Sequence, residues 1–296
     1  MVGPVYAISA AISYALNSTF IRRASLKVPD ASFGTLITVP MAVPYFFLIL
    51  TLNGQIQSIF SFTWQSYVYL ALAGIVHFVV GRSLSYRCVQ LVGANIASIL
   101  RRFSILVAVV IGLSFLREPF SWQLAGGVVL IVTGLTLAGF SPHTIRTSDG
   151  RILKIPVKAI MLGLGCGLSW GISPILARLA LRESGSPIAG AFISFVAATA
   201  VLSVSLLNRK RRASAAYLTG GAAILFFIAG LLSCTANLFR YLALSLAPAS
   251  VISPLVATSP VFVMIFSFLF NRKLEIFSKQ IIIGTITVVI GTILLV

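Results

Sequence analysis

Long apolar stretches alternate with short polar ones along the whole chain. A helix needs about 20 apolar residues to cross the hydrocarbon of a bilayer. Stretches of that length occur at 3–21, 33–52, 66–84, 92–115, 121–140, 159–179, 187–207, 217–238, 249–270 and 278–296. The segments between them carry turn residues and charge, as in RRASLKVPD, NRKRRAS and NRKLEIFSK. The pattern predicts an all-α integral membrane protein with ten transmembrane helices.

Composition agrees with a chain that is surrounded by lipid. Hydrophobic residues make up 58% of the 296 positions and charged residues 9%, whereas a soluble domain carries about 25% charged residues. The mean hydropathy is +1.05. The first stretch, 3–21, has no basic residues before it and no clear cleavage site, so we interpret it as a span rather than a removable signal. We expect a multi-pass protein of the cell membrane, plasma or inner.

The two halves of the chain resemble each other at a nearly constant offset. The offset is 156 near the start, where Ser13-Tyr14-Ala15 aligns with Ser169-Trp170-Gly171. It is 155 further in and 157 at the end, where a Glu-x4-Gln-x3-Gly-x6-Gly pattern recurs. At the offset of 155, Tyr86, Ala94 and Ser98 match Tyr241, Ala249 and Ser253. At the offset of 157, Glu118, Gln123, Gly127 and Gly134 match Glu275, Gln280, Gly284 and Gly291.

Each half has five predicted spans, an odd number, so the second half enters the membrane from the opposite side. This predicts inverted repeats, as in many secondary transporters, whose substrate site lies near the midplane between the repeats. We divide the chain into a first repeat at 1–140, a linker at 141–158 and a second repeat at 159–296.

Three motifs resemble one known family. They are WGISP at 170–174, SPVFVMIFSFLF at 259–270 and the Glu-Gln-Gly-Gly pattern of both halves. The chain is similar over its full length to the EamA-type, ten-helix members of the drug/metabolite transporter superfamily. The first half departs from the pattern at Tyr14-Ala15, where Trp-Gly is usual, and at Ile105, where the second half has Pro260. The resemblance implies a central cavity lined by the first four helices of each half, with the last helix of each half at the periphery.

The formal charge of +17 comes mainly from residues between the apolar stretches. Sixteen of the 22 lysines and arginines, Arg82 and Arg87 among them, fall on the side reached after the odd-numbered spans. The positive-inside rule places that side in the cytoplasm and both termini outside. This distribution sets topology and does not suggest binding to nucleic acid. Cys88, Cys166 and Cys234 have no metal or disulfide spacing, and we expect neither a metal nor another cofactor.

Arg101 and Arg102 interrupt span four near its middle. A central arginine is unfavourable by about 2.5–3.5 kcal/mol on insertion scales, so it usually faces a protein interior or a watery cavity. The two lie about 100° apart on a helix, so one is expected to face the cavity while the other packs or snorkels. A guanidinium binds a carboxylate or phosphate with two parallel hydrogen bonds. The alternative is a structural pair that caps carbonyls or bonds an acid in a loop.

Acidic residues are absent from the predicted interiors of the spans. Asp30, Glu118, Asp149, Glu183 and Glu275 all fall in loops or at helix ends, and we expect Glu118 and Glu275 to cap the spans that follow them. No carboxylate is placed to bind a cationic drug or to carry a coupling proton. Pro254 and Pro260 should interrupt the hydrogen-bond ladder of span nine and leave a bend.

Other polar and aromatic residues within the spans complete the predicted cavity. His77 can exchange a proton near neutral pH, or it can simply bond neutrally between helices. Tyr14 and Trp170, at matched positions, can form aromatic walls for an amphiphilic ligand. Ordinary helix packing is the alternative for each of the candidates, which are Arg101, Arg102, His77, Tyr14, Asn17, Trp170, Ser173 and Asn237.

These observations predict a secondary transporter, and not an enzyme, that exports small anionic or zwitterionic metabolites such as amino acids or organic anions. The alternative is a membrane scaffold or a lipid-translocating protein. The glycines seven residues apart in each last helix permit close helix contact. That contact is expected either within one subunit or, alternatively, in a homodimer.

Overall fold

A computed structural model gives the structure of the chain. It describes residues 2–115, 122–137, 145–146, 152–153, 155–181, 186–207, 217–246, 255–256 and 258–294.

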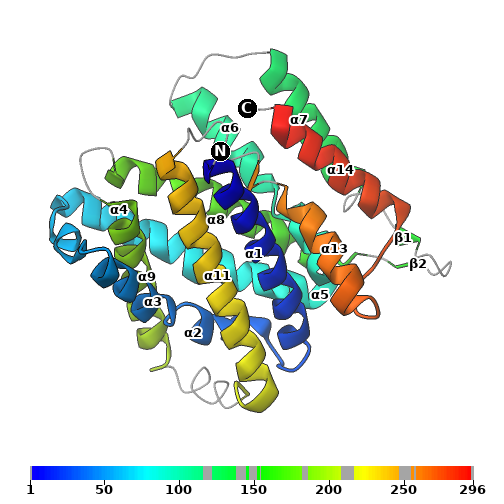
Figure 1. Ribbon diagram of the computed structural model, residues 1–296. Helices are drawn as coiled ribbons and strands as arrows, with labels where there is room; N and C mark the ends of the chain where they lie inside the picture. The colour runs from blue at the N-terminus through cyan, green and yellow to red at the C-terminus, as the bar shows by residue number, and fades with distance from the viewer. Residues whose placement is uncertain are drawn as a thin grey trace.

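The first half crosses the membrane in five helical passes (Figure 1). The passes are, in order, α1 (Val2–Ser25); η1 (Ala31–Gly34), α2 (Thr35–Thr38) and α3 (Ala42–Leu52); α4 (Trp64–Gly74), η3 (Ile75–Gly81) and α5 (Arg82–Leu100) as far as Gly93; the rest of α5 with α6 (Phe103–Phe115); and α7 (Trp122–Leu135). A short helix, η2 (Ile56–Phe60), lies in the connection between α3 and α4. The segment η3 is π-helical.

The second half repeats this arrangement after a small ladder of β1 (Ile145–Arg146) and β2 (Ile152–Leu153), which pair antiparallel. Its helices are α8 (Val157–Leu181), α9 (Pro187–Ser205), α11 (Gly220–Leu246), α13 (Ser259–Asn271) and α14 (Lys279–Leu294). In the part of the chain that the structure describes, the two halves together form the all-helical, ten-pass membrane fold that the apolar stretches predict.

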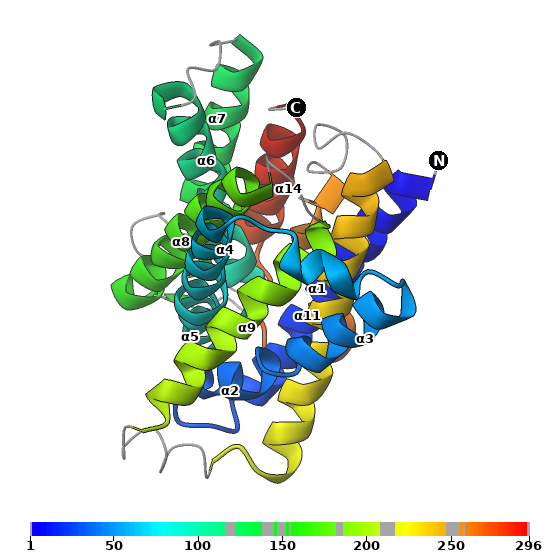
Figure 2. The same ribbon diagram turned by 90° about the vertical axis from the view of Figure 1, so that its left-hand side faces the viewer.

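The helices of one half pack mainly on those of the other, in matching pairs. The first helix of the first half, α1, lies along α11, the third pass of the second half, and also contacts α13. The first helix of the second half, α8, lies along α4, η3, α5 and α6 (Figure 2). The last helices, α7 and α14, lie side by side at the edge of the bundle. This exchange of equivalent contacts is the symmetry expected of inverted repeats.

Small residues let these helices approach closely. Helix α1, which packs on α11, α13 and α5, carries Ala7, Ala10, Ala11 and Ala15, all fully buried. In α7, a Cβ at Gly134 would lie 2.7 Å from the carbonyl oxygen of Gly284 in α14. The glycines of the last helices therefore serve packing within one chain, which is the first of the two alternatives for them. Close approach of small residues is the usual way for helices to pack in lipid.

The third and fourth passes differ from the sequence prediction. A break was expected between 84 and 92, but the helix continues through Arg82 and Arg87 until Gly93, where φ is 84° and ψ is 170°. Glycine adopts this backbone conformation readily and other residues rarely do. Arg82 is consequently buried inside the bundle at 5% exposure. Its assignment to a loop in the charge count was wrong, because hydropathy does not distinguish an inward-facing arginine from one that ends a span.

Two other helix ends also correct the prediction. Glu275 does not cap the helix that follows it; its carboxylate accepts hydrogen bonds from the Ala94 and Asn95 N–H groups of the other half. Ser278 caps α14 instead, with its hydroxyl accepting from the Ile281 N–H at 3.2 Å. Pro260 lies in the first turn of α13, where a proline disrupts no hydrogen bond, so it does not bend that helix. Glu118 and Pro254 lie outside the described residues.

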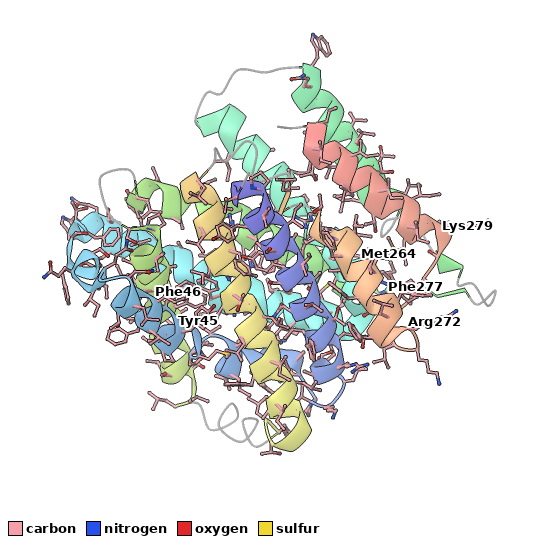
Figure 3. All side chains as sticks on the ribbon, in the orientation of Figure 1. Tyr45, Phe46, Met264, Arg272, Phe277 and Lys279 are labelled. Atoms are coloured by element: carbon pink, nitrogen blue, oxygen red, sulfur yellow. The ribbon has the colours of Figure 1, made fainter. Side chains whose placement is uncertain are left out.

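One end of the bundle is strongly basic. We call it the basic end: α1 ends there, α5 is kinked there at Gly93, and α13 connects to α14 there. Figure 3 labels Arg272 and Lys279 on either side of that connection, whereas both ends of the chain lie at the opposite end of the bundle in Figure 1. The basic end carries Arg22, Arg23, Lys27, Arg87, Arg272, Lys273 and Lys279.

Candidate functional site

Two aromatic residues at matched positions reach into the opposite repeat. Tyr14 of α1 donates its hydroxyl hydrogen to Oδ1 of Asn237 in α11 at 2.9 Å. Trp170 of α8 stacks on the ring of His77 in η3, with ring centroids 5.2 Å apart and planes 13° apart. The Trp170 indole also donates to the carbonyl oxygen of His77 at 3.2 Å. The two predicted aromatic walls therefore lie on the interface between the repeats.

His77 is held by α8 on two sides. Its Nδ1 lies 2.7 Å from the hydroxyl oxygen of Ser173, and its ring is stacked on Trp170. The Trp170 ring also fits against Gly81, where an added Cβ would lie 2.6 Å from it. The π-helical turns of η3 thus present a histidine and a bare backbone to the same face of α8. Three of the predicted site residues, His77, Trp170 and Ser173, are therefore in contact with one another around the His77 ring.

Arg101 and Arg102 point to different neighbours, as their angular separation predicts. The Arg101 guanidinium donates to the hydroxyls of Ser85 at 2.7 Å and Ser18 at 3.2 Å. It also lies 5.6 Å from the centroid of the Trp170 ring, within the range of a cation–π interaction. Arg102 instead donates to Ser259 of α13 at 2.5 Å. Arg101 therefore belongs with Trp170 and His77, and Arg102 belongs to the contact with α13.

Two further arginines in the interior were not singled out from the sequence. Arg82 donates to the carbonyl oxygen of Thr38 and to the hydroxyl of Ser233, both at 3.0 Å. Its guanidinium lies 5.0 Å from the centroid of the Phe78 ring. Arg240 of α11 lies near the Tyr14 hydroxyl. Each follows a long apolar run, and that position made it resemble a charge flanking a span.

Asn237 connects Tyr14 to Arg82 through Ser233. Its Nδ2 donates to the carbonyl oxygen of Ser233 at 2.8 Å, and Ser233 accepts from Arg82. Asn17 lies nearby on α1 and donates to the carbonyl oxygen of Ala229 at 2.5 Å. We call the following residues the central cluster: Tyr14, His77, Arg82, Arg101, Trp170, Ser173, Asn237 and Arg240. Asn17 borders it, and Arg102 lies apart from it.

The central cluster is positively charged and closely packed. Its arginines are bonded to hydroxyl and carbonyl groups, which accept hydrogen bonds but carry no charge. The carboxylates among the described residues are Asp30 and Glu275, both at the basic end. Ser173 and Asn237 are 3% and 5% exposed. An anion that reaches the cluster would meet guanidinium groups, and neither of the described carboxylates lies among them.

No metal site is visible in the part of the chain that the structure describes. No three histidine, cysteine or acidic side chains among the described residues gather closely enough to bind a metal ion. Cys88, Cys166 and Cys234 are separate, buried thiols. The described contacts within the central cluster are hydrogen bonds, ring stacking and a cation–π contact.

The comparisons with known proteins concern the family and the fold. The EamA-like transporter family matches residues 1–140 and 157–296. No curated protein matches the chain. A solved structure titled "Crystal structure of protein" has a TM-score of 0.64 and 13% sequence identity, and the match covers 99% of this chain and 96% of that one. At that identity the likeness shows the fold alone.

Inverted helical repeats with a polar cluster between them define a polytopic membrane transporter. The chain belongs to the EamA-like transporter family, and the family's match to both halves is the basis for that assignment. It is therefore a multi-pass integral membrane protein and a transporter of the drug/metabolite transporter superfamily. Members of the family are transporters and not enzymes.

Proposed function

We propose that this protein is a secondary transporter that carries small anionic or zwitterionic metabolites, such as amino acids or organic anions, outward by alternating access. The central cluster is the proposed substrate site, and Arg101 is the proposed contact for the anionic group. One observation carries the proposal. Arg82, Arg101 and Arg240 surround the interface between the repeats, and no described carboxylate lies beside them.

The physical reason is the free-energy cost of burying a guanidinium group without a negative charge beside it. Removing a guanidinium from water costs several kcal/mol, and neutral hydrogen-bond acceptors restore only part of that cost. A carboxylate or phosphate would supply the missing charge as well as acceptors for two parallel hydrogen bonds. A substrate with such a group would therefore bind the cluster better than a cation of the same size.

Arg101 is the better of the two predicted arginines for this role. Its present partners, Ser18 and Ser85, are neutral hydroxyls that a substrate can replace. Its guanidinium lies 5.6 Å from the centroid of the Trp170 ring, which belongs to the contact between η3 and α8. Arg102 is bonded to Ser259 of α13, so we propose that it links α6 to α13.

The test is uptake into liposomes by the purified protein, with a panel of amino acids, dicarboxylates and organic cations. We expect transport of anionic or zwitterionic compounds and none of the cations. Arg101→Ala should lower the apparent affinity about tenfold to a hundredfold, because a hydrogen bond to a charged group contributes about 1.5–3 kcal/mol. Arg101→Lys should recover part of this loss, since lysine keeps the charge without the two-pronged geometry.

Arg102→Ala is the matched control, because it removes the neighbouring guanidinium from outside the cluster. We expect its apparent affinity to stay within about threefold of the parent, by the usual small effect of a contact remote from the substrate. Equal losses in both variants, or normal transport by Arg101→Ala, would contradict the role of Arg101. Absence of transport for the entire panel, with a folded protein, would favour the scaffold or lipid-translocating alternative.

A further inference from the structure

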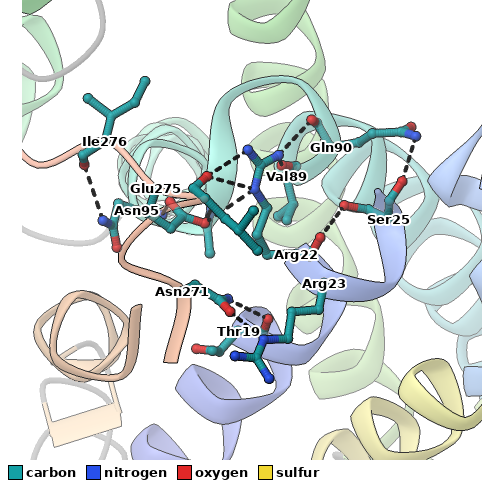
Figure 4. A network of polar contacts seen from close by, with 12 residues as sticks. Thr19, Arg22, Arg23, Ser25, Val89, Gln90, Asn95, Asn271, Glu275 and Ile276 are labelled. Carbon is teal, nitrogen blue, oxygen red and sulfur yellow. Dashed lines mark hydrogen bonds and ion pairs between the residues drawn. The ribbon is translucent and has the colours of Figure 1, made fainter. Parts of the chain in front are cut away.

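A buried carboxylate joins the two repeats at the basic end. Glu275, in the connection between α13 and α14, is 8% exposed. Its Oε1 accepts from the Ala94 N–H at 2.6 Å, and its Oε2 accepts from the Asn95 N–H at 3.1 Å. The Asn95 side chain donates in turn to the carbonyl oxygen of Ile276 at 3.3 Å. Figure 4 shows these residues of the second half and of α5 facing each other.

Arg22, near the end of α1, also binds at this junction between the two repeats. Its Nε lies 3.6 Å from Oε1 of Glu275. Its guanidinium also donates to the carbonyl oxygen of Leu274 and to those of Val89 and Gln90, the last two at 3.0 and 2.8 Å (Figure 4). These last carbonyls belong to the helical turn before Gly93. Arg22 thus binds the end of one helix while Glu275 binds the start of the next.

The kink at Gly93 is what makes room for the carboxylate. A Cβ at Gly93 would lie 2.4 Å from Oε2 of Glu275, so another side chain there would displace it. Burial raises the pKa of the Glu275 carboxyl, and the Ala94 N–H, Arg22 and the Asn95 N–H oppose that rise. Burial outweighs them, so the pKa lies above its ordinary value, and each of the three partners stabilises the ionised form.

Within the described residues, the hydrogen bonds and the ion pair of the Glu275 carboxylate all cross from one repeat to the other. Arg22, Ala94 and Asn95 belong to the first half, and Glu275 belongs to the second. An adjacent pair has the same property, since Arg23 donates to Oδ1 of Asn271 in α13 at 2.7 Å. The repeats must separate at one end for a solute to reach the central cluster.

We propose that Glu275, with Arg22 and the backbone of Ala94 and Asn95, is a latch that holds the basic end closed during the transport cycle. The proposal rests on the proposed transport function, in which the two repeats move against each other. Opening of the basic end requires the Glu275 carboxylate to leave the two N–H groups. The latch is released as a unit, because separating the repeats breaks the contacts of Glu275 and of Arg22 together.

The test measures the distance between the repeats without any substrate. Spin labels are attached at Leu91→Cys on α5 and Lys273→Cys in the second half, both at exposed positions, in protein reconstituted in lipid. Electron–electron double resonance then reports the distance distribution. Glu275→Gln should raise the ratio of the long-distance to the short-distance population about tenfold, because it replaces a charged acceptor of two N–H groups by a neutral one. Arg22→Gln should shift the ratio in the same direction.

Arg87→Gln is the matched control. It removes a guanidinium at the same end, but the partner of Arg87 is Asp30 of the same repeat, so the distance distribution should not change. The proposal is overturned if Glu275→Gln and Arg22→Gln leave the distribution unchanged, or if both only prevent folding, since the network is then purely structural. A shifted distribution in a protein that carries none of the tested anions would reject the proposed substrate class and keep the latch.

Discussion

Adjacent residues with the same side chain have different surroundings here. Arg101 lies among hydroxyls and an indole ring, whereas Arg102 reaches the start of α13. The sequence predicts their angular separation but not which of them faces the interface between the repeats, because that depends on how α5 and α6 are rotated against α8. The same limit applies to Arg82. A hydropathy profile records its charge, and only the packing of α5 shows that it is buried.

The Asp30–Arg87 ion pair makes a pH-dependent contribution to stability. Burial raises the pKa of the Asp30 carboxyl, but hydrogen bonds from Arg87 and from the Ser32 N–H outweigh that effect, and the resulting pKa is below its ordinary value. The folded protein therefore favours the ionised form. This contribution is complete above the unfolded pKa, about 4, and is lost as the pH falls through the lower folded value.

We expect Asp30→Asn to remove this pH dependence. Above about pH 5 the variant should be less stable by roughly 0.2–1 kcal/mol, a small amount because the pair is partly exposed to solvent. Below the folded pKa of Asp30 the difference should vanish. Thermal unfolding in detergent at a series of pH values, from pH 7 down to the lowest at which the protein stays folded, measures both quantities. An equal difference at every pH would show that the carboxylate charge is not the cause.

At the scale of the helices, apolar length predicts the number of passes well and their breaks poorly. Each apolar stretch has a helical counterpart, because about 20 apolar residues have no other stable arrangement in lipid. The break between passes three and four lies at Gly93 because an acid 182 positions away caps the helix that restarts there. A contact at that separation leaves no local signal. The matched positions of Tyr14 and Trp170 in the repeats marked both as candidates, but their partners Asn237 and His77 came only from the structure.

The contact between α7 and α14 should depend on the absence of side chains at two glycines. A Cβ at Gly291 would lie 2.8 Å from the carbonyl oxygen of Gly127, and one at Gly134 would lie 2.5 Å from the Val288 side chain. Gly291→Ala is expected to lower the free energy of unfolding by about 1–3 kcal/mol, the usual effect of overpacking. Chemical or thermal unfolding in detergent measures the change.

Gly126→Ala in α7 provides the comparison, on the other helix of the same contact. Its Cβ would lie 3.2 Å from the flexible end of the Leu294 side chain, which can move aside. The loss of stability should be clearly smaller than for Gly291→Ala. If the two variants are equally stable, α7 and α14 do not pack as described.

For the whole molecule, the distribution of charge predicts how it sits in the membrane. Arg82 is buried, so it no longer counts among the sixteen basic residues assigned to one side of the membrane. The other described basic residues of that side still lie at the basic end. The positive-inside rule places this basic end in the cytoplasm. The connection between α3 and α4, at the opposite end, should then face the outside.

Single cysteines test this orientation. A membrane-impermeant thiol reagent added to intact cells should label Gln57→Cys and should not label Lys273→Cys, both of which are exposed positions. The native Cys88, Cys166 and Cys234 are buried and should give little background. Labelling of the second cysteine alone would reverse the orientation and would place the latch on the outer side.

The π-helical segment η3 bears on the history of the duplicated sequence. Between the first and third passes the offset of the repeats falls from 156 to 155, so the first half has gained one residue there, or the second half has lost one. An extra residue in an α-helix would rotate everything after it by about 100°. The wider turns of a π-helix absorb such a residue, and α11, the counterpart in the second half, has no π-helical segment. We infer that η3 marks this insertion, because a π-helical turn lets Tyr86 keep its matched position in the repeat despite one extra residue.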